Sequence, residues 1–170
     1  MLIYAIILVV VITRFIPHLP NFAPITALAI FSGANLGWKK SVGITLAVRF
    51  VSDIFLGFFS WPLMVAVYAS HLVGVLLGMW IKRSDNYRWL KIVGSSLGAS
   101  LIFFLATNFA FLYATYPHTV AGIVSAYANG LPFFRGTVLG DLGYTAALFG
   151  GYEFARRLAA QKIKFLIPNS

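Results

Sequence analysis

Ionisable side chains inside long apolar stretches are the first residues that need a chemical explanation. They are Arg14, Arg49, Asp53 and Asp141. A charge inside a membrane span is costly, so it usually faces a cavity or a partner of opposite charge. Arg49 and Asp53 are spaced i, i+4 and would share one helical face, where they can neutralise each other. These charged residues could form structural ion pairs or bind a ligand, and both interpretations stay open. An ion pair that supports the wall of a binding pocket would serve both roles.

The histidines give no pattern typical of a metal site. His18 and His118 lie beside prolines in expected loops, where a substrate or a metal could reach them, whereas His71 is interpreted as a packing residue of an apolar helix. None of the three has close acidic companions, as a histidine-based metal site usually does. The chain also lacks cysteine. We therefore expect no bound metal and no cofactor.

No motif in the sequence supports catalysis. The GxSxG, HExxH and Walker patterns are absent. The one enzymatic alternative is a catalytic dyad inside the membrane, formed by Asp53 and Asp141. That role would require the two carboxylates to approach closely. We expect a protein that is not an enzyme. Because it has no nucleotide-hydrolysing motif, active transport would need another subunit or an ion gradient.

The composition indicates a membrane protein. Hydrophobic residues make up 60% of the 170 residues and charged residues only 10%, whereas soluble domains carry about 25% charged residues. The uncharged stretches 15–38, 54–81 and 92–134 each reach the roughly 20 residues that a bilayer span needs. No soluble domain fits in what remains, so residues 1–170 are expected to form a single domain.

The apolar stretches and their breaks predict an all-α integral membrane protein with six transmembrane helices. The expected helices cover about residues 2–16, 22–37, 41–59, 62–81, 89–113 and 136–158. Residues 114–134 are too apolar for a solvated loop and are expected to form an interfacial segment. Three small-xxx-small glycine pairs favour close approach between helices. They are Gly33/Gly37, Gly74/Gly78 and Gly94/Gly98.

The basic residues predict the orientation. The net charge is +9, and ten of the 13 basic residues would lie on one side of a six-helix layout. These are Lys39, Lys40, Lys82, Arg83, Arg88, Lys91, Arg156, Arg157, Lys162 and Lys164. The positive-inside rule then places both termini in the cytoplasm of a multi-pass protein of the inner (plasma) membrane. The expected partner of these charges is anionic lipid of the bilayer, and no nucleic acid is expected.

Several runs resemble a family of uncharacterised small bacterial membrane proteins similar to the substrate-binding (S) components of energy-coupling-factor (ECF) vitamin transporters. The matching residues are 14–24, 27–34, 52–53, 57, 107–109, 116–122, 127, 130–134, 137 and 140–142. The resemblance implies an S-component-like bundle of six helices with both termini cytoplasmic. It also implies a pocket near the outer face that takes up a vitamin or another small micronutrient.

The resemblance and the positions of the polar residues give the candidate substrate-binding residues. They are Arg14, His18, Asn21, Asp53, Asn108, His118, Tyr127 and Asp141. Many S components carry an Ala-xxx-Ala pair on the first helix for docking to an energising module, whereas here Ala5 is followed by Val9. Docking to an ECF-type module and action as a solitary protein both stay open. The alternative to transport is a membrane scaffold or assembly protein.

Overall fold

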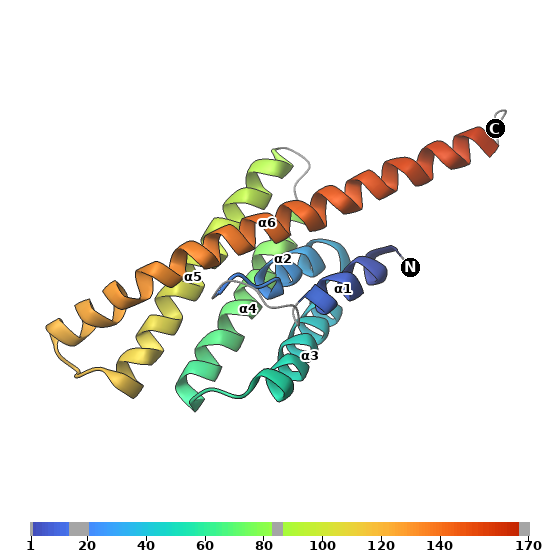
Figure 1. Ribbon diagram of the computed structural model, residues 1–170. Helices are drawn as coiled ribbons and strands as arrows, with labels where there is room; N and C mark the ends of the chain where they lie inside the picture. Colours follow the sequence, from blue (N-terminus) through green and yellow to red (C-terminus); the bar gives the residue numbers. More distant parts are fainter. Residues whose placement is uncertain (1, 14–20, 83–86, 167–170) are drawn as a thin grey trace.

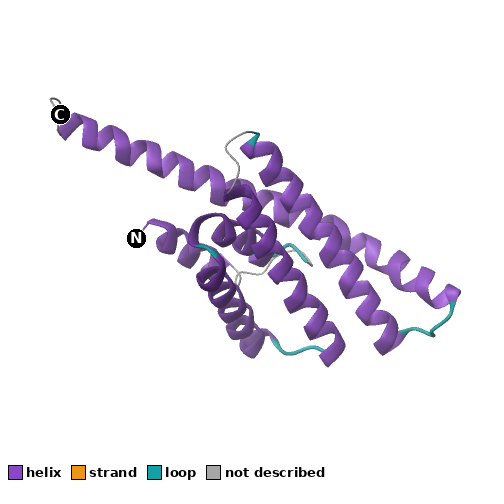
Figure 2. Ribbon diagram, turned by 180° about the vertical axis from the view of Figure 1, so that it is seen from behind, coloured by secondary structure: helices purple, strands orange, loops and turns teal. Residues whose placement is uncertain are grey.

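The computed structural model describes residues 2–13, 21–82 and 87–166. All regular structure in these ranges is α-helical, in six helices: α1 (Leu2–Thr13), α2 (Ile25–Leu36), α3 (Trp38–Leu56), α4 (Trp61–Lys82), α5 (Arg88–Thr115) and α6 (Val120–Leu166). The prediction of an all-helical chain with six helices is therefore confirmed for the described ranges. Figures 1 and 2 show the α3–α4 and α5–α6 turns at one end of the bundle, with the start of α1 and the end of α6 toward the other.

The short helix α2 is the centre of the bundle. Ten consecutive residues, Ile25 to Ala34, are buried on every side of it. Phe31 makes edge-to-face contacts with Phe149 and Tyr152 of α6, at centroid distances of 5.3 and 5.6 Å. At 1.5 Å per residue the 12 residues of α2 extend about 18 Å. A buried helix of this length brings its first turn into the interior of the molecule.

Close packing of α2 against α4 depends on two glycines. A Cβ on Gly33 would meet the carbonyl oxygen of Val75, and a Cβ on Gly78 would meet that of Ile30. Gly74 is also at this crossing, where an added Cβ would lie 3.2 Å from the Cβ of Ala29. Gly33, Gly74 and Gly78 therefore allow the close approach that the glycine pattern predicts, whereas Gly37 has nothing within 4 Å of an added Cβ. Gly94 also differs, since a Cβ there would meet nothing within 4 Å.

The exterior of the bundle is apolar, and polar side chains gather inside it. Phe55, Val120 and Leu139 are 72%, 79% and 61% exposed, and many other large apolar side chains are exposed like them. Conversely, Arg49, Asp53 and Asp141 are at most 6% exposed. A water-soluble protein rarely presents contiguous apolar surface on this scale. This distribution is the one expected of a protein surrounded by hydrocarbon.

Two of the described helices contain segments long and apolar enough to cross a membrane. They are Trp61–Ile81 of α4 and Arg88–Ala110 of α5. The helices α1 and α2 are apolar but shorter, and α3 carries Arg49 and Asp53 within its 19 residues. Six transmembrane spans therefore stay a prediction.

The last helix differs from the sequence prediction. An interfacial segment at 114–134 and a separate helix at 136–158 were expected, whereas α6 runs without interruption through 47 residues and contains Pro132. Proline inside a helix removes a backbone hydrogen bond. Neighbouring helices and local adjustments can compensate for that loss in an apolar environment. Figure 1 shows the C-terminal part of α6 extending beyond the other helices.

Smaller differences concern the other helix ends. The predicted end of the first helix, residues 14–16, lies outside the described residues. The second helix begins at Ile25 instead of 22, after Pro24. Gly37, at φ 76°, separates it from α3, and Gly57, at φ 98°, ends α3 earlier than predicted. Glycine adopts such positive φ values without steric cost, so both helix ends are sharp.

Candidate functional site

Two adjoining cavities lie inside the bundle, with volumes of about 210 and about 200 Å³. The first is lined by Asn21, Ala23, Ile25, Thr26, Arg49, Phe59, Leu63, Val67, His71, Phe103, Thr107, Thr137 and Asp141. The second is lined by Asn21, Phe103, Phe104, Thr107, Asn108, Gly130, Phe133, Phe134 and Thr137. Asn21, Phe103, Thr107 and Thr137 line both. We call the two together the interior cavity.

The start of α2 forms one wall of the interior cavity. Asn21 adopts φ 59°, and its carbonyl accepts a hydrogen bond from the Ala23 backbone N–H at 3.1 Å. Pro24 then provides the N-cap, which has no side-chain cap hydrogen bond. The first backbone N–H groups of a helix have no partner within the helix and carry partial positive charge. The chain therefore presents the polar end of α2 beside the cavity, next to Thr26.

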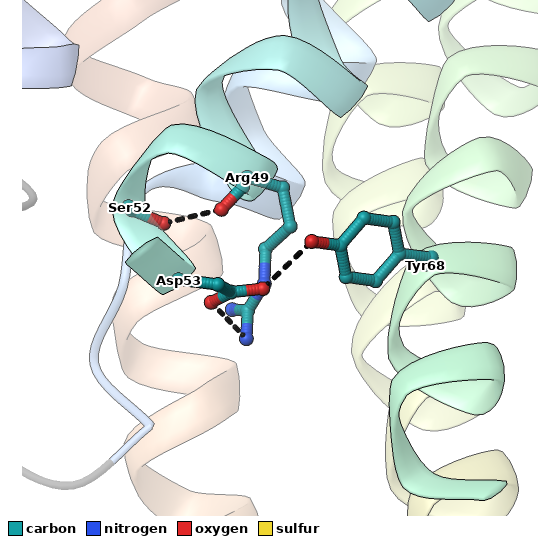
Figure 3. A network of polar contacts seen from close by, with 4 residues as sticks. All are labelled: Arg49, Ser52, Asp53 and Tyr68. Atoms are coloured by element: carbon teal, nitrogen blue, oxygen red, sulfur yellow. Dashed lines mark hydrogen bonds and ion pairs between the residues drawn. The ribbon is translucent and has the colours of Figure 1, made fainter. Parts of the chain in front are cut away.

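Arg49 and Asp53 form a buried ion pair on α3. The Arg49 Nε donates to Asp53 Oδ2 at 2.9 Å, and Nη2 lies 2.8 Å from Oδ1. The Tyr68 hydroxyl of α4 donates to the same Oδ2 at 2.8 Å (Figure 3). The guanidinium carbon is 5.4 Å from the ring centroid of Phe59. The spacing of the two residues predicted this pair, and the contact with Tyr68 links it to a second helix.

Only one member of this ion pair reaches the interior cavity. Arg49 lines the cavity, whereas Asp53 is fully buried and is not among its lining residues. Arg49 has five N–H donors, so it can bind Asp53 and still donate toward the cavity. Asp53 thus holds Arg49 at the cavity wall, as the expected structural ion pair would, and substrate binding by Asp53 itself stays a prediction.

Asp141 of α6 also lines the cavity. It is 2% exposed, and its Oδ2 accepts a 2.6 Å hydrogen bond from the Ser100 hydroxyl of α5. The Thr26 side chain of α2 is a further hydrogen-bonding neighbour. One turn further along α6, the Thr145 hydroxyl forms a 3.5 Å hydrogen bond with the Ser96 hydroxyl of α5. Three helices thus meet at one carboxyl group beside the cavity.

The second lobe of the interior cavity depends on a contact between Asn108 and Gly130. Asn108 Nδ2 donates to the Phe104 carbonyl at 2.7 Å. A Cβ on Gly130 would overlap the Asn108 amide, so only glycine leaves room for that side chain between α5 and α6. Thr107 is held similarly, donating to the Phe103 carbonyl at 2.8 Å. Asn108 is thereby fixed with its side chain at the cavity wall.

The structure brings together some of the predicted site residues. Asn21, Asn108 and Asp141 line the interior cavity. Tyr127 does not; its hydroxyl donates to the Leu105 carbonyl at 3.1 Å, joining α6 to α5. His118 lies exposed in the α5–α6 turn, away from the lining residues. Arg14 and His18 lie outside the described residues.

Other lining residues were not predicted to bind. Thr26 and Thr137 lie in apolar stretches where a threonine looks like a packing residue. His71 was interpreted as a packing residue, and it does stack on Phe103 at 5.7 Å between centroids, yet it also lines the cavity. The sequence feature that could have identified these lining residues is the clustering of polar residues in the same helices as Arg49, Asn108 and Asp141. No group of three histidines or carboxylates arranged to hold a metal occurs in the described part of the chain.

Comparison with known proteins places the chain in a family. Residues 1–163 match the model of a family of unknown function, DUF6580. The chain belongs to DUF6580. No curated protein and no solved structure matches it. The function of this DUF6580 member must therefore be argued from the interior cavity itself.

Proposed function

We propose that the protein is an S-component-like membrane transport protein that binds a vitamin or another small micronutrient in the interior cavity. The observation that carries the proposal is a cavity with a few fixed polar groups inside a bundle whose outer surface is apolar. Binding sites for small molecules are concave, mostly apolar and provided with a few fixed polar groups. Arg49, Asn108 and Asp141 are such groups, each held by an intramolecular hydrogen bond.

Membrane embedding follows from the exposed apolar side chains and from the positions of the charges. We infer six membrane-crossing segments with both termini in the cytoplasm, because the basic residues lie at the beginnings of α3 and α5 and the end of α6. The 47 residues of α6 extend about 70 Å, more than twice the hydrocarbon thickness of roughly 30 Å. Its basic C-terminal part therefore emerges on the cytoplasmic side. The interior cavity then opens toward the outer side.

The lining of the cavity suits a small, flat molecule with both donors and acceptors. Phe59 and Phe103 offer ring faces, and His71 is stacked on Phe103. Arg49 can donate to a carbonyl or ring nitrogen, and Asp141 can accept from an amine. The two lobes together reach the lower part of the roughly 300–1,000 Å³ range of small-molecule sites. Heterocyclic vitamins and nucleobase-like compounds have this size and chemistry.

Ligand binding is tested by thermal unfolding of the purified protein with a panel of vitamins and nucleobase-like compounds. A compound present at 100 times its Kd stabilises the folded state by about 2.7 kcal/mol. This stabilisation raises the midpoint temperature of unfolding by several degrees. We expect one chemical class to do so. Thr137→Leu, which places extra atoms in both lobes, should abolish the shift, whereas the matched control Leu139→Ala on the exposed face of α6 should keep it. A panel without any stabilising compound would contradict the proposal.

A scaffold role is the second candidate, and one observation favours it. Phe154 and Leu158, near the C-terminal end of α6, are 65% and 51% exposed. A partner protein could pack there. If the protein is a scaffold, a photoreactive residue at position 158 should crosslink reproducibly to one partner protein. In that case no compound of the panel should stabilise the protein.

A further inference from the structure

A second concave surface lies outside the bundle, between the C-terminal half of α4 and the N-terminal half of α5. This groove of about 400 Å³ is lined by Leu77, Trp80, Leu90, Lys91, Gly94 and Ser95. None of these residues lines the interior cavity. The groove therefore needs its own explanation.

The groove combines an apolar floor with a cation at its edge. The Lys91 Nζ lies 4.9 Å from the ring centroid of Trp80, in a cation–π contact. Trp80 and Leu90 are 51% and 70% exposed. Tryptophan and lysine together are typical of the level at which lipid headgroups meet hydrocarbon. The groove thus runs from a charged edge toward the apolar middle of the bundle.

Gly94 keeps the groove open. A Cβ on Gly94 would meet nothing within 4 Å, so a larger side chain would occupy empty space without displacing a neighbour. Next to it, the Ser95 hydroxyl is buried and has no hydrogen-bond partner. The space beside Gly94 lies within the groove and is therefore available to another molecule.

The charges around the groove favour an anionic occupant. Lys82 ends α4, and Arg88 and Lys91 lie in the first turn of α5, so three basic residues of the described ranges lie near this end of the two helices. Arg88 has an acidic neighbour, with Nη1 3.7 Å from Glu153 Oε2. Among the described residues, those that line the groove include no carboxylate. A lipid with a net negative headgroup complements both the positive edge and the apolar floor, whereas a soluble anion would leave the floor exposed.

We propose that this groove is a binding site for one anionic phospholipid, with the phosphate near Lys91 and an acyl chain along Leu77 and Gly94. The site rests on the proposed membrane embedding but not on transport. Basic pockets between membrane helices bind anionic headgroups in this way. The bound lipid would cover the α4–α5 junction at the cytoplasmic surface.

The test is native mass spectrometry of the purified protein with phosphatidylglycerol or phosphatidylcholine added in equal amounts. We expect one phosphatidylglycerol to be retained several-fold more than phosphatidylcholine. Lys91→Gln should reduce its retention about fivefold. Gly94→Leu should remove both lipids from the site while the thermal midpoint stays unchanged or rises. Lys40→Gln, an exposed basic position outside the groove, is the matched control and should retain the lipid as the wild type does.

Three results would overturn the proposal. Equal retention of the two lipids by the wild type would show that charge plays no part. An equal loss from Lys40→Gln and Lys91→Gln would show that the effect is general attraction to the basic surface. Binding of glycerol 3-phosphate at a similar strength would show that the groove takes a soluble anion instead of a lipid.

Discussion

Gly78→Ala is expected to destabilise the bundle strongly. The added methyl would overlap the carbonyl oxygen of Ile30 and would lie 3.0 Å from the backbone nitrogen of Ala34, so α2 and α4 would have to separate. Backbone atoms cannot move aside as a flexible side chain can, and over-packing of this kind costs 1–3 kcal/mol or more. We expect a loss of about 3 kcal/mol, measured as a large fall in the thermal midpoint and in the yield of monodisperse protein.

The matched control is Gly43→Ala. Gly43 is also inside a helix, but a Cβ there would meet nothing within 4 Å. Alanine has the higher helix propensity by about 1 kcal/mol, so this variant should be as stable as the wild type or more so. A Gly78→Ala protein of wild-type stability would mean that α2 does not pack against α4 as described.

Arg49→Met and Asp53→Leu are each expected to destabilise the protein strongly, and the double variant much less. Each single change leaves a buried charge without its partner, which costs about 3–5 kcal/mol. The double change removes both charges, and replacing a buried ion pair by apolar residues of similar volume is often neutral or stabilising. Unfolding of the four proteins by heat or denaturant gives the coupling energy of the pair.

The same variants separate a structural role of the pair from a binding role. If Arg49 donates to the ligand, the double variant folds but does not bind. Tyr68→Phe is a useful control, because it removes only the hydroxyl that donates to Asp53 and keeps the ring beside Arg49. Additive losses in the double variant would contradict the account of a mutually compensating pair.

The helical fold could be predicted because apolar length and charge position are local properties of the sequence. Six helices and the Arg49–Asp53 contact follow from periodicity and i, i+4 spacing. The continuity of α6 could not be predicted in this way. Asn129, Gly130 and Pro132 are residues that end helices in water, and only their surroundings, including the Asn108 side chain against Gly130, explain why the helix continues.

The interior cavity was predictable only in part. Asn108 and Asp141 stand out because polar side chains in apolar helices are costly. Thr26 and Thr137 line the cavity, whereas Thr145 does not and contacts Ser96 instead. The local sequence around these threonines does not predict this difference. That distinction depends on the rotation of each helix about its axis, and the rotation is set by packing against α2.

The central claim is that the outer, apolar surface of the helix bundle faces membrane hydrocarbon, while its polar side chains face a water-accessible cavity inside. Thr137 and Leu139 test it, because they are two residues apart on α6 and lie at almost the same depth. Thr137 is 4% exposed and lines the cavity, whereas Leu139 is 61% exposed on the outer surface. The chain has no cysteine, so single cysteines can be placed at either position without a background.

The decisive measurement is the rate at which a charged, membrane-impermeant methanethiosulfonate modifies Thr137→Cys and Leu139→Cys in intact cells. Such reagents react with the thiolate, which forms in water and not in hydrocarbon. The account predicts that the buried Thr137→Cys is modified, and Leu139→Cys is not, despite its greater exposure in the bundle. Rapid modification of Leu139→Cys together with an inert Thr137→Cys would contradict it.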